Sequence, residues 1–259
     1  MIPGIPYFNK NILLCPLDWG LGHAARCVPL IKQLQAQNNR IVIGCTGWQK
    51  DFLRGEVPNA EFTELFGYDV KYSENISLGL KILSQFPRLS LLVRKEHAWL
   101  AGFLKKNKID VVISDNRFGL YNKTVESVFI THQLFVPAPF LKSTVNKINF
   151  SFIKKHNACW VPDYAPEKGS LSGKLSHGDT GSVHIKYIGP LSRFSAQKPA
   201  AKKRHDVLIL LSGVEPQRSV LEEKLSASLA DPAIRVVLVR GTNKKIKTKF
   251  PVHFTVYDT

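Results

Sequence analysis

Short apolar runs alternate with amphipathic stretches over most of the chain. The runs have the length of buried strands, and they cover residues 12–15, 40–45, 61–65, 109–114, 128–131 and 158–161. A break with two glycines follows the first run, and from about His23 apolar residues recur at helical spacing. Strands that alternate with helices favour right-handed βαβ units and therefore a mostly parallel sheet.

A longer helical pattern covers residues 76–106, and Pro87 interrupts it. Its second half carries an apolar stripe that includes Leu92, Trp99 and Leu100, beside several Lys and Arg residues. Such a stripe is typical of a helix that packs on a core. The alternative is a face that lies on anionic lipid.

The alternation of strands and helices starts again after a basic stretch that contains Pro199. Strands are predicted over residues 206–211, 235–239 and 252–257, and a helix over 216–229. We therefore predict an α/β fold with two Rossmann-like domains: an N-terminal domain 1–190, a linker 191–205 and a partial C-terminal domain 206–259. Three strands and one clear helix are about half of a doubly wound domain, so we expect the second domain to be truncated.

Polar, reactive side chains follow several of the predicted strands. Ligands of parallel α/β sheets bind beyond the carboxyl ends of the strands, and the residues at those ends are Asp18, Thr46, Asp115, His132 and Asp163. The loop after the first strand adds the imidazole of His23, with Arg26 one helical turn further on. The sequence therefore predicts a polar site at this edge of the sheet.

The chain is strongly basic, with 36 Lys and Arg against 20 Asp and Glu and a formal net charge of +16. This surplus favours nucleic acid, anionic lipid or phosphorylated partners. Nucleic acid is disfavoured because no recognition motif accompanies the charge. The four cysteines have no C-x-x-C spacing, which disfavours a zinc site and a disulfide framework. There is no apolar signal segment, which predicts a cytoplasmic protein.

Dinucleotide binding is the first alternative that the glycine loop raises. Gly20, Gly22 and Ala25 fit the relaxed G-x-G-x-x-G/A pattern, but a single match is weak. That site also needs an acidic residue after the second strand, where this chain has Cys45, Thr46 and Gly47. NAD is therefore disfavoured, and a P-loop is excluded because the chain has no G-x-x-x-x-G-K-[ST].

Five stretches together resemble the GT-B glycosyltransferases. They are residues 18–26 (DWGLGHAAR), 114–117 (SDNR), 131–133 (THQ), 160–163 (WVPD) and 212–216 (SGVEP). The chain is most similar to the family 28 type, which includes the bacterial enzyme that adds N-acetylglucosamine to lipid-linked muramyl-pentapeptide.

This resemblance implies transfer of a sugar from a nucleotide-sugar donor, a UDP-hexose or UDP-GlcNAc, to an acceptor hydroxyl. It implies that the N-terminal half holds the acceptor and the C-terminal half holds most of the donor. A lipid-linked molecule is one option for the acceptor. No cofactor and no metal are expected, because such enzymes hold the diphosphate with backbone dipoles. A lipid-linked acceptor would place the protein at the inner face of the membrane, as a peripheral protein.

The resemblance also assigns roles to residues. His23 is the candidate base, and Asp115 is either a second base or the partner that orients the first. The acceptor and its loop would contact Gly20, Gly22, Arg26, Asn116, Arg117 and His132, and the donor diphosphate would lie near Ser212 and Gly213. Two structural alternatives stay open: His23 and Asp115 can each serve as a cap of the adjacent backbone.

The chain departs from the family in one respect. The glycine-rich and acidic motifs that bind the donor in the later part of the second domain do not occur here, so we expect little or no transferase activity from this chain alone. Two other functions remain open: a UDP-N-acetylglucosamine 2-epimerase of the same fold, and a non-catalytic protein that binds glycan or lipid.

Overall fold

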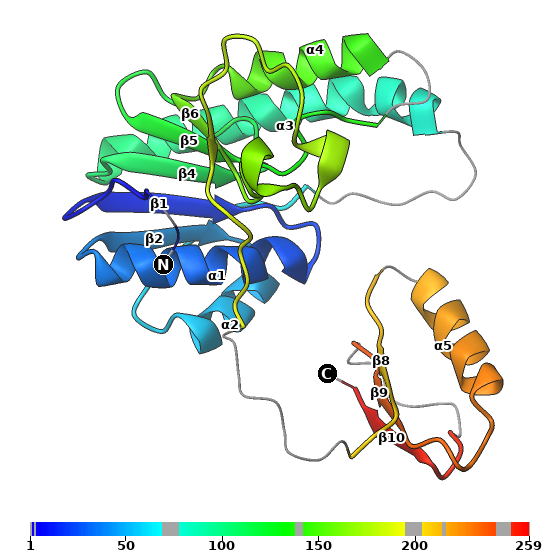
Figure 1. Cartoon of the computed structure of the whole chain (residues 1–259). Helices are drawn as coiled ribbons and strands as arrows, with labels where there is room; N and C mark the ends of the chain where they lie inside the picture. Colours follow the sequence, from blue (N-terminus) through cyan, green and yellow to red (C-terminus); the bar gives the residue numbers. More distant parts are fainter. Residues whose placement is uncertain are drawn as a thin grey trace. The chain divides into compact units, whose positions relative to one another are not determined.

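The computed structural model describes residues 2, 4–68, 78–137, 142–194, 204–213, 216–241 and 250–258, with the backbone alone for residues 78–87. The chain divides into two compact units, Met1–Ser195 and Ala196–Thr259. Each unit is described by itself below, with the element labels of Figure 1. Most of the predicted linker, 191–205, lies outside the described residues.

The first unit is built on a parallel sheet. Its strands are β1 (Asn11–Pro16), β2 (Arg40–Cys45), β3 (Glu61–Glu64), β4 (Val111–Asp115), β5 (Glu126–Ile130), β6 (Ala158–Val161) and β7 (Ile185–Tyr187). They lie in the order β3-β2-β1-β4-β5-β6-β7, and each described pair is parallel. The strand order reverses between β1 and β4, which are neighbours. This is the switch point beyond which open α/β sheets bind their ligands.

Helices cover both faces of this sheet. They are α1 (Leu21–Ala36), α2 (Gly47–Glu56), α3 (Leu78–Lys106) and α4 (Lys142–Ile153), with short 3₁₀ turns at Pro166–Lys168 and Gly173–Leu175. Because successive strand residues point to opposite faces, Ile12 and Leu14 pack in the cluster under α1, while Leu13 and Cys15 pack on the side of α3. The sheet is thus buried on both faces, as parallel sheets are.

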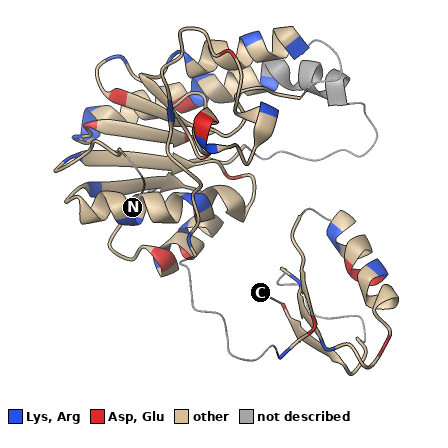
Figure 2. Cartoon of the chain, viewed as in Figure 1, with Lys and Arg blue, Asp and Glu red and all other residues tan. Residues whose placement is uncertain are grey.

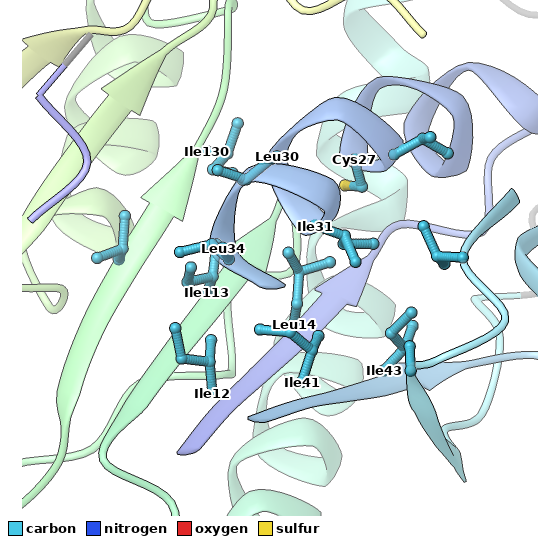
Figure 3. Packing of buried hydrophobic residues seen from close by; sticks show 14 of the residues in the cluster. Ile12, Leu14, Cys27, Leu30, Ile31, Leu34, Ile41, Ile43, Ile113 and Ile130 are labelled. Atoms are coloured by element: carbon cyan, nitrogen blue, oxygen red, sulfur yellow. The ribbon is translucent and has the colours of Figure 1, made fainter. Parts of the chain in front are cut away.

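Packing of α1 on the centre of the sheet fixes the start of that helix relative to the strand ends. Cys27, Leu30, Ile31 and Leu34 are fully buried and meet the isoleucines of β1, β2, β4 and β5 (Figure 3). A buried aliphatic side chain of this kind contributes about 1.5–3 kcal/mol. The helix begins at Leu21, two residues before the predicted start, after Gly20 with its positive φ of 86°.

The structure corrects one prediction for the first unit and adds two elements that the sequence did not predict. Pro87 does not interrupt α3, which runs through it, because a proline removes one backbone donor and the neighbouring turns keep theirs. Helix α4 was not predicted, and neither was β7, because both are short and carry polar residues among their apolar ones.

The second unit has a parallel sheet of three strands in the order β10-β9-β8. Its elements are β8 (Val207–Leu210), α5 (Gln217–Ser228), β9 (Val236–Val239) and β10 (Phe254–Tyr257). Ile209, Val236 and Leu238 form its core, whereas Leu208 and Leu210 on the opposite face of β8 are exposed. The predicted strands and helix of this region are all present, with ends shifted by one or two residues.

Candidate functional site

The site centres on Asp115, the last residue of β4, which is fully buried. Its Oδ2 lies 3.0 Å from Nδ1 of His23 and accepts a 2.9 Å hydrogen bond from Nε of Arg26. Nη2 of Arg26 donates to the other oxygen, Oδ1. Both partners come from the first turns of α1, so this carboxylate ties the start of α1 to the end of β4.

Two features of the fold bring these residues together. The sheet register places Pro16, where β1 ends, opposite Asp115. The glycine loop then turns the chain back over the sheet edge, and α1 presents His23 and Arg26, which are three residues apart, on the same side. His23, Arg26 and Asp115 therefore lie together at the carboxyl edge of β1 and β4, where the sequence predicts a polar site.

The electrostatics of the site keep Asp115 ionised. Burial alone would raise the pKa of the Asp115 carboxyl, but the charge of Arg26 and the hydrogen bond from His23 outweigh it and lower that pKa. The pKa of His132, which follows β5, is also lowered, but for a histidine this favours the neutral form. Its partial burial, together with the nearby Arg26 and His23, lowers the pKa of His132 and favours the neutral ring.

A cavity of about 420 Å³ opens beside this cluster. The strand ends and the start of α1 supply most of its polar lining, namely His23, Asn116, Thr131, His132 and Gln133. Its apolar walls include Leu89 and Leu92 of α3 and Val145, Ile148 and Phe152 of α4, with Trp19 from the glycine loop. The cavity is thus polar at the strand ends and mainly apolar between the two helices, where Arg88 and Asn149 also line it.

The structure brings some of the predicted site residues together and leaves others apart. His23, Asn116 and His132 line the cavity, and Asp115 and Arg26 lie behind the two histidines. Gly20 caps α1, and Gly22 lies in the first turn of that helix. Ser212 and Gly213 belong to the second unit, between β8 and α5, where both are exposed.

Arg117 does not line the cavity, which corrects its predicted place among the acceptor-binding residues. It is fully buried, and its guanidinium donates to the carbonyls of Pro16 and Phe66 and to the carboxylate of Glu96. Nη2 also lies 3.5 Å from Asp18. These contacts join the end of β1 to α3, so Arg117 supports the wall of the cavity from behind.

The α4 wall of the cavity is absent from the sequence prediction. Val145, Ile148 and Phe152 recur at intervals of three and four residues, which is the spacing of one helical face. That pattern is the signal that identifies α4. The α3 wall was predicted in part, because Leu92 belongs to the apolar stripe that sequence analysis described.

The described residues include no group of His, Cys, Asp and Glu arranged to hold a metal ion. Of the helices that the structure describes, none combines the length and apolar character that crossing a bilayer requires. Lys and Arg are scattered over helices and loops of both units, with Asp and Glu among them (Figure 2).

Sequence comparison relates this chain to uncharacterised glycosyltransferases. No protein-family model matches the sequence. An uncharacterised glycosyltransferase of Methanosarcina mazei is 26% identical over 89% of this chain and 65% of the relative, so this chain spans less than two thirds of that relative's length.

Solved structures similar to this chain are glycosyltransferases. UGT89C1 of Arabidopsis thaliana, in complex with UDP-L-rhamnose, has a TM-score of 0.58 at 14% identity. The match covers 95% of this chain and 68% of the UGT89C1 chain. UGT2 of Phytolacca americana, in complex with UDP-2-fluoro-glucose and pterostilbene, has a TM-score of 0.54 at 13% identity, with coverages of 89% and 66%.

The chain therefore has an α/β fold of the GT-B type, as the sequence predicts. Its sequence is similar to those of curated relatives that are named uncharacterised glycosyltransferases. The finer predictions, of family 28 and of the peptidoglycan enzyme, stay predictions.

Proposed function

We propose that this chain takes part in transfer of a sugar from a nucleotide-sugar donor to a hydroxyl group of an acceptor held in the cavity of the first unit. The observation that carries the proposal is the contact between buried, ionised Asp115 and Nδ1 of His23, whose ring lines the cavity. A carboxylate behind an imidazole is the arrangement of a positioned general base.

The proton positions follow from the partners of each atom. Nδ1 of His23 lies 3.0 Å from Asp115 and 2.9 Å from Nη2 of Arg26. We assign the proton to Nδ1, because Asp115 is a charged acceptor and Arg26 already donates to the same carboxylate. Nε2 of His23 then keeps its lone pair and is free to accept a proton from the acceptor hydroxyl.

The reaction balances with these groups. The hydroxyl oxygen of the acceptor forms a bond to the anomeric carbon of the donor sugar while its proton moves to Nε2 of His23. The bond between that carbon and the nucleoside diphosphate breaks, and the diphosphate leaves with the electron pair. Asp115 stabilises the imidazolium that results and does not itself take the proton.

The cavity favours an acceptor whose hydroxyl is attached to an apolar body. Apolar side chains of α3 and α4 would bury that body, at about 25 cal/mol for each Å² removed from water. The hydroxyl would then lie at the polar strand ends, beside His23. Both an aromatic alcohol and a lipid-linked acceptor have this chemistry, and the pterostilbene in the Phytolacca americana complex is consistent with it.

For the donor we propose a UDP-sugar, a UDP-hexose or UDP-GlcNAc. The UDP-sugars in the two solved neighbours and the resemblance to the family 28 type support this choice. Ser212 and Gly213 precede α5, and free backbone N–H groups before a helix suit a diphosphate.

We also propose a cytoplasmic protein that meets anionic lipid at the inner face of the membrane. The formal net charge of +16 supports the contact with lipid, since it favours anionic partners. Co-sedimentation with vesicles of anionic phospholipid, lost at high salt because salt screens the attraction, tests this location. Equal sedimentation with neutral vesicles would contradict it.

Product detection tests the proposed reaction. Because we expect weak turnover from this chain alone, the purified protein is incubated at high concentration with UDP-glucose or UDP-GlcNAc and 4-phenylphenol, and the glycosylated phenol is measured by mass spectrometry. His23→Ala should lower product formation by about 10²–10⁴-fold, the usual contribution of a general base. His184→Ala, at an exposed histidine of the same unit, is the matched control and should leave it unchanged. Product that forms equally well with His23→Ala refutes the proposal.

A further inference from the structure

Two histidines of the cavity share one guanidinium. Nη1 of Arg26 lies 3.1 Å from Nδ1 of His132, and Nη2 lies 2.9 Å from Nδ1 of His23. The two rings are therefore neighbours, and Arg26 fixes their positions relative to each other. Both rings line the same polar end of the cavity.

The contact with Arg26 determines the tautomer of His132. A guanidinium has only donors, so Nδ1 of His132 must accept the hydrogen bond. Burial and the nearby charge of Arg26 lower the pKa of His132, which keeps the ring neutral. A neutral imidazole whose Nδ1 accepts carries its proton on Nε2. His132 is thus held as an N–H donor on the side away from Arg26.

The two histidines have opposite hydrogen-bonding roles. Nδ1 of His23 faces the Asp115 carboxylate as well as Arg26, so with its proton assigned to Nδ1 it donates to Asp115 and leaves Nε2 as an acceptor. Nδ1 of His132 faces Arg26, accepts from it and leaves Nε2–H as a donor. Two adjacent polar groups of the cavity, on Thr131 and Asn149, are engaged in holding the loop after β5. Thr131 Oγ1 accepts from the N–H of Gln133, and Asn149 donates to the Gln133 carbonyl.

We infer that His132 selects acceptors that carry a second oxygen next to the reacting hydroxyl, as in a catechol, a vicinal diol or a hydroxyl beside a carbonyl group. The reacting hydroxyl gives its proton to His23, and the second oxygen accepts the hydrogen bond from Nε2–H of His132. This inference rests on the proposed function, because it takes the cavity to be the acceptor site.

A pair of probes that differ by one oxygen tests this selection without any donor. Calorimetry measures binding of 4-phenylcatechol and of 4-phenylphenol to the purified chain at neutral pH. The wild-type protein should bind the catechol about 3–10-fold more tightly, because one added neutral hydrogen bond contributes about 0.5–1.5 kcal/mol. His132→Phe keeps an aromatic ring and removes the donor, so its two affinities should be equal.

A conservative variant separates this role from simple structural support. His132→Gln keeps an N–H donor and should restore most of the preference for the catechol, although its shape differs from that of imidazole. His23→Ala should retain the preference, since both probes carry the hydroxyl that meets His23. The thermal unfolding midpoint of each variant is measured alongside the affinities to verify that it folds.

The outcomes distinguish this inference from the proposed function. Equal affinities in the wild-type protein, no binding of either probe, or a preference that survives in His132→Phe overturns the role of His132. Product formation with no catechol preference removes the inference alone. A catechol preference that depends on His132, with product formation that His23→Ala leaves unchanged, removes the proposed transfer mechanism and leaves the binding role.

Discussion

The carboxyl ends of β4 and β6 offer a comparison within one sheet. Each carries an aspartate that is fully buried: Asp115 is the last residue of β4, and Asp163 follows two residues after β6 ends. In both residues burial would raise the pKa of the carboxyl, and hydrogen bonds or charges outweigh it and lower that pKa. By burial and ionisation alone the two sites are the same.

Their partners differ. Oxygens of Asp163 accept from hydroxyl and backbone N–H groups of the loop that follows, namely Ser170, Leu171, Ser172 and Ser176, and His177 lies 3.3 Å away. All of these partners lie within 14 positions of Asp163 in the sequence. This carboxylate therefore organises its own loop, and it does not line the cavity.

Asp115 takes its partners from another element, the helix α1, whose residues lie about 90 positions away in the sequence. One of them, His23, also faces the cavity, and the other, Arg26, contacts His132. A lowered pKa at a strand end thus marks an ionised carboxylate in both places. A carboxylate whose partners come from another element and reach the cavity indicates a candidate site. A carboxylate whose partners all come from the following loop stabilises that loop.

The largest effect is expected from Asp115→Asn. The substitution leaves the guanidinium of Arg26 largely buried without its ionic partner, so the free energy of unfolding should fall by about 3–5 kcal/mol. Urea denaturation at pH 7 measures this change. Asp51→Asn, at an exposed aspartate of α2, is the control and should change stability by less than about 0.5 kcal/mol. A similar small change in Asp115→Asn would show that the buried pair does not stabilise the fold.

Asp163→Asn should have a smaller effect on stability and none on the cavity. Loss of charge-assisted hydrogen bonds should lower the free energy of unfolding by about 2 kcal/mol at pH 7, while binding of 4-phenylcatechol stays unchanged. Altered binding of that probe would contradict the division between the two strand ends.

The pH dependence of Asp163 follows from the direction of its shift. Because the pKa of Asp163 is lowered in the fold, its carboxylate stabilises the protein fully above the unfolded value of about 3.9 and loses that contribution as the pH falls below it. The unfolding midpoint of Asp163→Asn should therefore fall less steeply in acid than that of the wild-type protein.

Much of the fold follows from the sequence because buried parallel strands are continuous apolar runs. Strands β2 and β6 were predicted with their observed bounds, and β1 within one residue of each end. Helix α4 was missed because Asn146, Asn149 and Ser151 separate its apolar positions. Two of these polar residues make local contacts that the sequence does not reveal: Asn149 donates to loop carbonyls, and Asn146 accepts from Val136.

The sequence predicted where the site lies in the fold, but not which of its side chains are in contact. Strand ends of a parallel sheet meet at one edge, so topology alone puts His23, Asp115 and His132 near one another. Their pairing depends on the β1–β4 register and on the rotation of α1, which the sequence does not specify. Arg117 shows the limit most clearly: it directly follows two site residues, yet its side chain points into the protein and meets Glu96.

The smallest effect on stability at neutral pH is expected from substitution of His156. This histidine is buried without an ionic partner among the described residues, so it tests the effect of burial alone on ionisation. It packs against Phe129 and Tyr121, and burial, with a small contribution from Lys155, lowers the pKa of His156 to about 4. Unlike the two aspartates, it is held in its neutral form. The unfolded chain, with a histidine pKa of about 6.5, binds this proton first, so the wild-type protein loses stability as the pH falls from about 6.5 toward 4.

His156→Phe removes the titration and keeps an aromatic ring in the same packing. The free energy of unfolding should change by less than about 1.5 kcal/mol at pH 7.5, and the decrease between pH 7.5 and pH 5 should be about 1–2 kcal/mol smaller than in the wild-type protein. Urea denaturation at the two pH values measures both quantities, and His184→Ala, at an exposed histidine, is the control that should keep the wild-type decrease. An unchanged decrease in His156→Phe would mean that the buried ring titrates as in the unfolded chain, and that burial without an ionic partner does not control ionisation in this fold.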